Sequence, residues 1–251
     1  MKKAASFALG CKVNQYESEA IAELFAEKGY EIVGIDEEAD VYVINTCTVT
    51  NFGDKKCRQL IRKVKRQNEN AIVAVVGCYA QTAPKELMEI AGVNLVNGTK
   101  DRAQIVEMVE QYDRANGVEN HVSDIMKERV FEPLSIQKLA NRTRAYLKIQ
   151  DGCSQYCSYC IIPYARGRVR SRKKEDVVEE VRTLAKHGYQ EVVLTGIHLS
   201  SYGLEWKDEN GKQTEGLLDL IRAVHGVEGI KRIRLGSLEP RIVTEEFAKE
   251  L

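Results

Sequence analysis

The chain has 251 residues, of which 29% are charged and 43% hydrophobic, the balance of an ordinary globular protein with a sizeable core. Basic and acidic residues are equal at 37 each, so a nucleic-acid partner would have to be bound by a local patch and not by overall charge. No apolar run approaches the roughly 18 residues of a membrane-spanning helix, and the start Met1-Lys2-Lys3 is no signal peptide. We therefore expect a cytoplasmic protein without a membrane partner, whose seven cysteines stay reduced.

The first 112 residues alternate short apolar segments with amphipathic ones, which is typical of a parallel sheet with helices on both faces. One predicted helix ends at Gly29, which readily takes the left-handed conformation of a helix stop, and Thr82 and Thr99 are predicted caps of later helices. We predict an N-terminal open parallel α/β sheet domain over residues 1–112. Its strands are expected at residues 4–9, 31–33, 41–44, 71–76 and 94–96.

Three cysteines of this domain, Cys11, Cys47 and Cys78, each follow a predicted strand. In an open α/β sheet, ligands bind beyond the carboxyl ends of the strands, so the three thiols are expected to reach one crevice. Three thiolates without a fourth protein ligand suit a [4Fe–4S] cluster that has one open iron. The alternative is that they are small buried residues at strand ends, as free cysteines often are.

The helix predicted after the second of these cysteines has an apolar stripe and a basic face. Cys57 precedes Ile61 and Val64 at helical spacing, so we place it in the core. Seven cations lie between Asp54 and Glu69 without an acid, which indicates either a solvated surface or a contact with a phosphate backbone. The candidate RNA contacts on this face are Lys55, Lys56, Arg62, Lys63 and Arg66.

The alternating pattern is lost over residues 113–141, which contain Pro133, and we predict an interdomain linker there. It returns in residues 142–251, with strands expected at 144–150, 191–194 and 230–235 and helices at 174–187 and 217–224. This order indicates a parallel (β/α) barrel. Because three strands cannot close a barrel, we expect a partial (β/α) barrel truncated at its C-terminal side, the front part of a longer protein.

The first barrel strand leads into a loop with the spacing Cys-x3-Cys-x2-Cys, formed by Cys153, Cys157 and Cys160. Three thiolates again leave one corner of a cubane cluster without a protein ligand. A zinc knuckle would need a fourth ligand, and the nearest histidine, His187, lies far along a predicted helix. A disulfide with a leftover thiol would suit a secreted protein. The residues therefore favour a second [4Fe–4S] cluster.

Other polar residues follow the later barrel strands. Thr195-Gly196 allow a close backbone approach, and Ser237 and Glu239 offer a hydroxyl and a carboxylate to a ligand. The alternative for each is an ordinary turn. Residues 166–174 are rich in arginine and would suit a bound carboxylate or phosphate.

The later cysteine spacing, with an aromatic residue just before the last cysteine, resembles the radical S-adenosylmethionine (radical SAM) enzymes. In that family the open iron binds the amino and carboxylate groups of SAM, and an electron from the cluster cleaves SAM to a 5′-deoxyadenosyl radical. With both triads present, the whole chain resembles the methylthiotransferases, radical SAM enzymes with a second cluster in an N-terminal domain. The most specific stretches are residues 10–17, 45–50, 77–78 and 148–167. The form Cys-Lys-Val-Asn-Gln-Tyr-Glu at residues 11–17 looks like the MtaB branch, which acts on threonylcarbamoyl-adenosine next to the tRNA anticodon.

This resemblance implies two [4Fe–4S] clusters and SAM as cofactors. The later triad would hold the cluster that cleaves SAM, and the earlier triad would hold the auxiliary cluster that carries the sulfur; no catalytic side chain beyond these ligands is assigned. A radical is needed because a purine C–H is too weakly acidic for a general base, whose gain is about 10²–10⁴. The implied partners are the tRNA anticodon stem-loop, an electron donor protein and a sulfur donor. The expected SAM contacts are Tyr159, Thr195, Gly196, Ser237 and Glu239.

Two other functions stay open at this point. The same chemistry on a ribosomal protein side chain is disfavoured by the basic helix and by the form of residues 11–15. A non-enzymatic electron carrier with two clusters would need no SAM pocket. Family members normally continue into a fuller barrel and a small RNA-binding TRAM domain, which these 251 residues lack.

Overall fold

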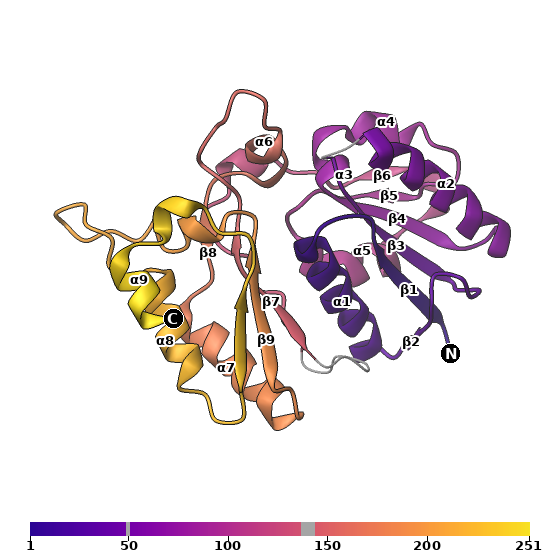
Figure 1. Cartoon of the computed structure of the whole chain (residues 1–251). Coiled ribbons are helices and arrows are strands. Elements are labelled where there is room, and N and C mark those ends of the chain that lie inside the picture. Colours follow the sequence, from indigo (N-terminus) through magenta and orange to yellow (C-terminus); the bar gives the residue numbers. More distant parts are fainter. Residues whose placement is uncertain (49–50, 137–143) are drawn as a thin grey trace. The chain divides into compact units, whose positions relative to one another are not determined.

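The computed structural model describes residues 1–48, 51–136 and 144–251 (Figure 1). The chain forms two compact units, each built on its own sheet. The first unit contains Met1–Glu128, Glu132–Leu134 and Ser158–Arg166, and the second contains Arg129–Phe131, Ser135–Cys157 and Gly167–Leu251. Among the described residues, no helix combines the length and the apolar character needed to cross a membrane.

The sheet of the first unit has six parallel strands in the order β2-β1-β3-β4-β5-β6, which confirms the open parallel α/β sheet. The central strands β3 and β4 are almost wholly buried, as expected for apolar runs that are covered on both faces. The strands are β1 (Lys3–Ala8), β2 (Glu31–Ile32), β3 (Val41–Thr46), β4 (Ile72–Gly77), β5 (Leu95–Val96) and β6 (Glu119–Asn120).

Helices cover both faces of this sheet because successive strand residues point to opposite sides. Tyr42 and Ile44 pack with the apolar stripe of α2, whereas Val41 and Val43 pack with residues of α1 and α5. The helices are α1 (Lys12–Glu27), α2 (Asn51–Gln67), α3 (Cys78–Thr82), α4 (Pro84–Met88), α5 (Ile105–Gln111) and α6 (Ile162–Arg166), with short 3-10 turns η1 (Arg102–Gln104), η2 (Arg114–Asn116) and η3 (Ile125–Lys127).

Two of the predicted helix caps are wrong. Thr82 ends α3 and donates its hydroxyl to the carbonyl of Cys78, and the following helix is capped by Ala83. The hydroxyl of Thr99 donates to the carbonyl of Ala165, a contact between distant parts of the chain that local sequence does not show. The predicted stop at Gly29 is confirmed by its positive φ of 84°.

The segment predicted as a linker contains structure of its own. β6 pairs with β5 through Leu95 and Glu119, so the sheet extends into this segment. Residues 137–141 of the predicted linker lie outside the described residues. The segment Ser158–Arg166 belongs to the first unit although it follows the start of the second sheet. The domain boundaries at residues 112 and 142 stay predictions.

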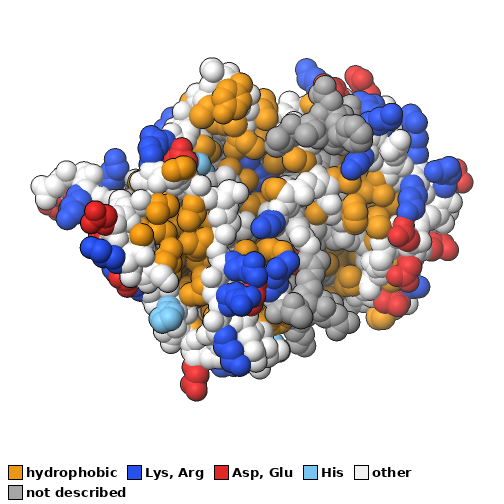
Figure 2. Space-filling model, viewed as in Figure 1, with side chains coloured by type: hydrophobic (Ala, Val, Ile, Leu, Met, Phe, Trp, Pro, Cys, Tyr) orange, Lys and Arg blue, Asp and Glu red, His pale blue; other side chains and the backbone are white. Residues whose placement is uncertain are grey.

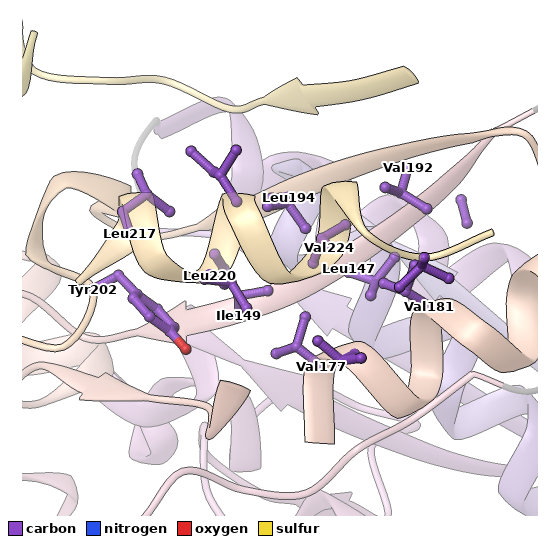
Figure 3. Packing of buried hydrophobic residues seen from close by; sticks show 14 of the residues in the cluster. Leu147, Ile149, Val177, Val181, Val192, Leu194, Tyr202, Leu217, Leu220 and Val224 are labelled. Atoms are coloured by element: carbon purple, nitrogen blue, oxygen red, sulfur yellow. The ribbon is translucent and has the colours of Figure 1, made fainter. Parts of the chain in front are cut away.

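The second unit has a sheet in the order β10-β9-β7-β8, in which β7, β9 and β10 are parallel, as the (β/α) pattern predicts. The antiparallel strand β8 was not predicted; it pairs with the end of β7. Figure 3 shows the core, in which Leu147, Leu194 and Val192 of the strands meet Val181 of α7 and Leu220 of α8. The elements are β7 (Ala145–Asp151), β8 (Arg170–Ser171), α7 (Lys174–Lys186), β9 (Glu191–Gly196), η4 (Leu199–Ser201), α8 (Leu217–His225), β10 (Arg232–Leu235), η5 (Pro240–Ile242) and α9 (Glu245–Glu250).

Candidate functional site

Three cysteines of the first unit follow the carboxyl ends of three adjacent parallel strands. β3 and β4 end in register, with Thr46 opposite Gly77. Cys47 directly follows β3, and Cys78 directly follows β4. Cys11 lies between the neighbouring strand β1 and the start of α1. The topology therefore brings the three cysteines to the same edge of the sheet, where open α/β sheets bind their ligands.

Gly10 allows the loop that carries Cys11 to lie against Cys47. A Cβ atom added at Gly10 would stand 2.9 Å from the Cβ of Cys47 and 3.1 Å from Oδ1 of Asn14. Such contacts are too close for any residue but glycine unless the neighbours shift. The Sγ of Cys11 donates to the same Oδ1 of Asn14 at 3.0 Å, so its thiol has a defined direction.

A buried amide network holds Asn14 in place. Its Nδ2 donates to Oδ1 of Asn45 at 2.7 Å and to the carbonyl of Thr46 at 3.0 Å. Nδ2 of Asn45 in turn donates to Oε2 of Glu17 at 3.3 Å. These bonds link α1 to the end of β3, so they also set the distance between the loop of Cys11 and the strand that precedes Cys47.

Cys78 is buried, with 3% of its surface exposed, and its sulfur accepts a hydrogen bond from Nε of Arg166 at 3.1 Å. Burial raises the pKa of the Cys78 thiol to about 11, although the charge of Arg166 opposes this shift. A metal that binds this sulfur must therefore displace a proton, as is usual for cysteine ligands. The positive donor beside the sulfur fits the thiolate form that a cluster would require.

Among the described residues, no three Cys, His, Asp or Glu side chains are arranged to bind a single metal ion. In a cubane cluster each cysteine binds a different iron, so the ligands stand farther apart than those around one ion. The shared strand edge and the three sulfur donors fit such a cluster. The assignment of Cys11, Cys47 and Cys78 as its ligands stays a prediction.

Cys57 lies in the core, as predicted. It is fully buried in α2 and packs in the same apolar cluster as Ile61 and Val64. Because it lies on the opposite side of the helix from the basic residues, Cys57 can serve as a control cysteine in experiments on the six predicted cluster ligands. Val49 and Thr50, part of the motif at residues 45–50, lie outside the described residues.

The cysteine loop that follows β7 begins at Gly152, where a residue with a Cβ atom would be unfavourable. Gly152 has a φ of 70°, and an added Cβ would collide with the backbone carbonyl of Arg168. This close approach lets the backbone N–H of Cys153 donate to the carbonyl of Gly167 at 3.0 Å. Cys153 is buried, Cys157 is exposed and Cys160 is half-buried. Their role as cluster ligands stays a prediction.

A buried charge cluster anchors the end of β7, just before this loop. Nζ of Lys148 lies 2.5 Å from Oδ2 of Asp151, and Nη2 of Arg170 lies 3.6 Å from the same oxygen. Lys148 also stands 5.3 Å from the ring centre of Phe131, a cation–π distance. Sequence reasoning missed these residues; the available signal was a lysine in the middle of an otherwise apolar strand.

Three arginines of the segment 166–174 are buried and pair with carboxylates of the chain itself, because burial of a guanidinium requires a partner close by. The pairs are Arg166 with Glu17, Arg170 with Asp151 and Arg172 with Glu180. Binding of a carboxylate or phosphate ligand by this segment stays a prediction.

The expected SAM contacts lie in different surroundings. Thr195 is buried in β9, and Tyr159 is 92% exposed. Gly196 packs against β7, since an added Cβ would stand 2.9 Å from the Cβ of Gln150, which explains this glycine without a ligand. Ser237 is exposed. All four remain predictions.

The fifth expected contact, Glu239, lines a cavity of about 500 Å³ in the second unit, together with Gln155 and His198. Oε2 of Glu239 lies 3.5 Å from Nε2 of His198. The pKa of Glu239 is lowered, first of all by hydrogen bonds from Arg241 at 2.9 and 3.1 Å. The carboxylate is thus charged at neutral pH and faces a space large enough for a small ligand.

The predicted RNA contacts share one exposed face of α2, and Figure 2 shows Lys and Arg side chains gathered over this helix. Lys63 pairs with Asp36, whereas the other four residues are exposed. The helix also borders a hollow of about 1200 Å³. Its basic lining residues are Arg62, Lys63, Lys65 and Arg66. Clustered cations of this kind are what a phosphate backbone binds.

Comparison with known proteins bears on both units. Residues 3–98 match the profile of the family described as Uncharacterized protein family UPF0004, and residues 147–251 match the Radical SAM superfamily. The chain is 50% identical over 251 residues to the threonylcarbamoyladenosine tRNA methylthiotransferase MtaB of Bacillus subtilis (strain 168). The chain is thus similar to the MtaB-type radical SAM methylthiotransferases along its whole length. The family resemblance read from the motifs is thus confirmed.

Other relatives with the MtaB name are less similar to this chain. The MtaB protein of Aquifex aeolicus (strain VF5) is 40% identical over 247 residues, or 98% of the chain. The chain spans about half the length of these relatives, 54% of the Bacillus protein and 58% of the Aquifex protein. Among solved structures, the radical S-adenosylmethionine methyltransferase TsrM from Kitasatospora setae matches with a TM-score of 0.64 and 18% sequence identity. The match covers all of this chain and 57% of the TsrM chain. At that identity it supports the fold alone.

Proposed function

We propose that this protein is a tRNA methylthiotransferase that converts threonylcarbamoyl-adenosine next to the anticodon into its 2-methylthio derivative. The observation that carries the proposal is the 50% identity, along the whole chain, to a relative whose name states this activity. Relatives named as tRNA enzymes favour tRNA over a ribosomal protein as substrate. The match to the Radical SAM superfamily favours an enzyme over an electron carrier.

In this proposal the chain's own residues hold two [4Fe–4S] clusters and SAM. Cys153, Cys157 and Cys160 would hold one cluster, which supplies the electron that cleaves SAM. Gly152 and the bond from the Cys153 backbone to Gly167 shape that loop. An electron donor protein is a required partner, because each cleavage consumes an electron.

Cys11, Cys47 and Cys78 would hold the auxiliary cluster, whose open iron would carry the sulfur. A sulfur donor is then a second required partner, because each product molecule removes one sulfur atom. The residues beneath this edge, above all Asn14 and Glu17, keep the three ligand positions in place through buried hydrogen bonds. Such supporting bonds are normally needed for a metal site to keep its geometry.

The basic face of α2 would bind the backbone of the anticodon stem-loop. Four of its five predicted contacts are exposed, and four cations are among the residues that line the adjacent hollow. Contacts of this type supply affinity without reading sequence. Recognition of the modified adenosine itself would then belong to other parts of the protein.

Analysis of tRNA nucleosides from a strain that lacks the gene tests the proposed function. We expect the 2-methylthio nucleoside to disappear and threonylcarbamoyl-adenosine to accumulate, as measured by liquid chromatography and mass spectrometry. A plasmid that encodes the wild-type protein should restore the product. The Cys157→Ala variant should not restore it, whereas Cys57→Ala, which changes a core cysteine, should. An unchanged nucleoside profile in the deletion strain would refute the proposal.

A further inference from the structure

The hydrogen bond from Arg166 to the sulfur of Cys78 joins residues that are 88 positions apart in the chain. Both side chains are buried: Arg166 has no exposed surface and Cys78 has 3%. The bond lies within the first unit, to which Ser158–Arg166 belongs. A buried cation at a sulfur is an arrangement that packing alone does not require, because burying a guanidinium is costly.

Glu17 sets the direction of this guanidinium. Its carboxylate accepts from Nη1 and Nη2 of Arg166 at 2.5 and 3.1 Å. A guanidinium is planar and presents its N–H groups in a fixed fork, so two bonds to one carboxylate define where Nε points. In this structure Nε points at the sulfur of Cys78. Glu17 is itself held by Arg102, whose Nη1 lies 2.5 Å from Oε1.

The segment that delivers Arg166 is attached to the first unit at a second point. The hydroxyl of Thr99 donates to the carbonyl of Ala165 at 2.7 Å, and this bond is buried. The same segment carries Cys160, the last cysteine of the Cys-x3-Cys-x2-Cys motif. One short peptide thus bears a predicted ligand of one cluster and a donor to a predicted ligand of the other.

We propose that Arg166 is a positioning residue of the auxiliary cluster, which directs the Cys78 thiolate and raises the reduction potential of the cluster. The inference rests on the proposed function, because it presupposes a cluster at Cys11, Cys47 and Cys78. The couple is [4Fe–4S]²⁺ plus one electron to [4Fe–4S]⁺, with no bond formed or broken. The reduced form carries more negative charge, so a cationic N–H donor at a ligand sulfur stabilises it more than the oxidised form.

The test measures the potential of the auxiliary cluster alone. The intact protein with Cys153, Cys157 and Cys160 all changed to Ala should keep about four irons, the content of one cubane. In this background, Arg166→Met should retain the iron but be harder to reduce in a dithionite titration followed by electron paramagnetic resonance. We expect at least a tenfold change in the reduction equilibrium, about 59 mV lower for a one-electron couple.

Three further variants separate the bond to sulfur from general effects. Arg166→Lys keeps the charge but loses the fork, and its potential should lie between those of the background and Arg166→Met. The double variant Glu17→Gln with Arg166→Met removes Arg166 together with the charge of its carboxylate partner, so the net charge at the site is unchanged; its potential should also fall. Arg102→Met removes the other guanidinium from the same carboxylate and should shift the potential less than Arg166→Met.

The outcomes distinguish this inference from the proposed function. A background protein that binds no iron would refute the auxiliary cluster, and with it the proposed function. A second outcome would overturn the role of Arg166 alone. In it the background protein holds about four irons, but neither Arg166→Met nor the double variant changes the reduction equilibrium by more than twofold. Equal shifts for Arg102→Met and Arg166→Met would also overturn it, because they would indicate a general charge effect.

Discussion

Replacement of Gly152 by alanine should disturb the start of the cysteine loop without touching a cysteine. Gly152 has a φ of 70°, a conformation that costs about 1–2 kcal/mol for a residue with a Cβ. The added Cβ would also collide with the carbonyl of Arg168 and stand 2.7 Å from the carbonyl of Gly167. The latter carbonyl accepts the bond from the Cys153 backbone.

The expected cost has two parts that can be worked from this geometry. Relief of the collision must move residues 167–168 away from the loop, which breaks the bond between Cys153 and Gly167, and a lost hydrogen bond costs about 0.5–1.5 kcal/mol. Together with the backbone strain, we expect about 2–3 kcal/mol of destabilisation.

Gly188→Ala is a matched control in the same unit. Gly188 has a φ of 89°, and an added Cβ there would have no neighbour within 4 Å. It should therefore cost only the conformational part, about 1–2 kcal/mol. Urea denaturation followed by circular dichroism measures both variants, and iron analysis after anaerobic reconstitution should show less iron for Gly152→Ala than for Gly188→Ala. Equal destabilisation and equal iron content in the two variants would refute the reasoning.

Three other predictions follow from the charges and hydrogen bonds. Asp151→Asn should cost about 3–5 kcal/mol in urea denaturation, because it breaks a buried ion pair with Lys148; a loss below 1 kcal/mol would contradict this role. Burial raises the pKa of Tyr202, so the unfolded chain loses the phenol proton at a lower pH than the folded chain does. The free energy of unfolding should therefore be unchanged below the ordinary tyrosine pKa of about 10 and fall as the pH rises above it. Tyr202→Phe should flatten that fall in unfolding measurements from about pH 8 to about pH 11. Arg62→Glu with Arg66→Glu should weaken tRNA binding and lower the slope of log affinity against log salt concentration by about 1–2, whereas Arg182→Glu on the exposed face of α7 should do neither; equal effects would remove α2 from the interface.

Much of the architecture and the six candidate cluster ligands followed from local sequence patterns. The alternation of apolar segments with amphipathic ones predicted a parallel sheet with helices on both faces, and the central strands β3 and β4 are indeed almost wholly buried. Once those strands were placed, the three cysteines behind them had to reach one edge. The Cys-x3-Cys-x2-Cys spacing is contained in a single loop, so no long-range information was needed to recognise it.

The interpretation of the polar residues at other positions depended on distant partners. Thr99 was predicted as a helix cap, but its hydroxyl binds the carbonyl of Ala165, 66 positions away. Thr82 failed as a cap because its hydroxyl bonds back into the preceding turn. A side chain with several possible acceptors takes the one that the folded chain brings near, and local sequence does not say which that is.

The arginines show this division most clearly. By sequence, residues 166–174 were a basic segment without assigned partners, and the cysteine motifs before them carried the family resemblance. Only the tertiary structure assigned Arg166 to Glu17, 149 positions away, and to the sulfur of Cys78. Periodicity and spacing report which residues share an element or a loop, whereas the partner of a buried charge is decided by which segments pack together, because the cost of burial is met only where an opposite charge lies within a few ångströms.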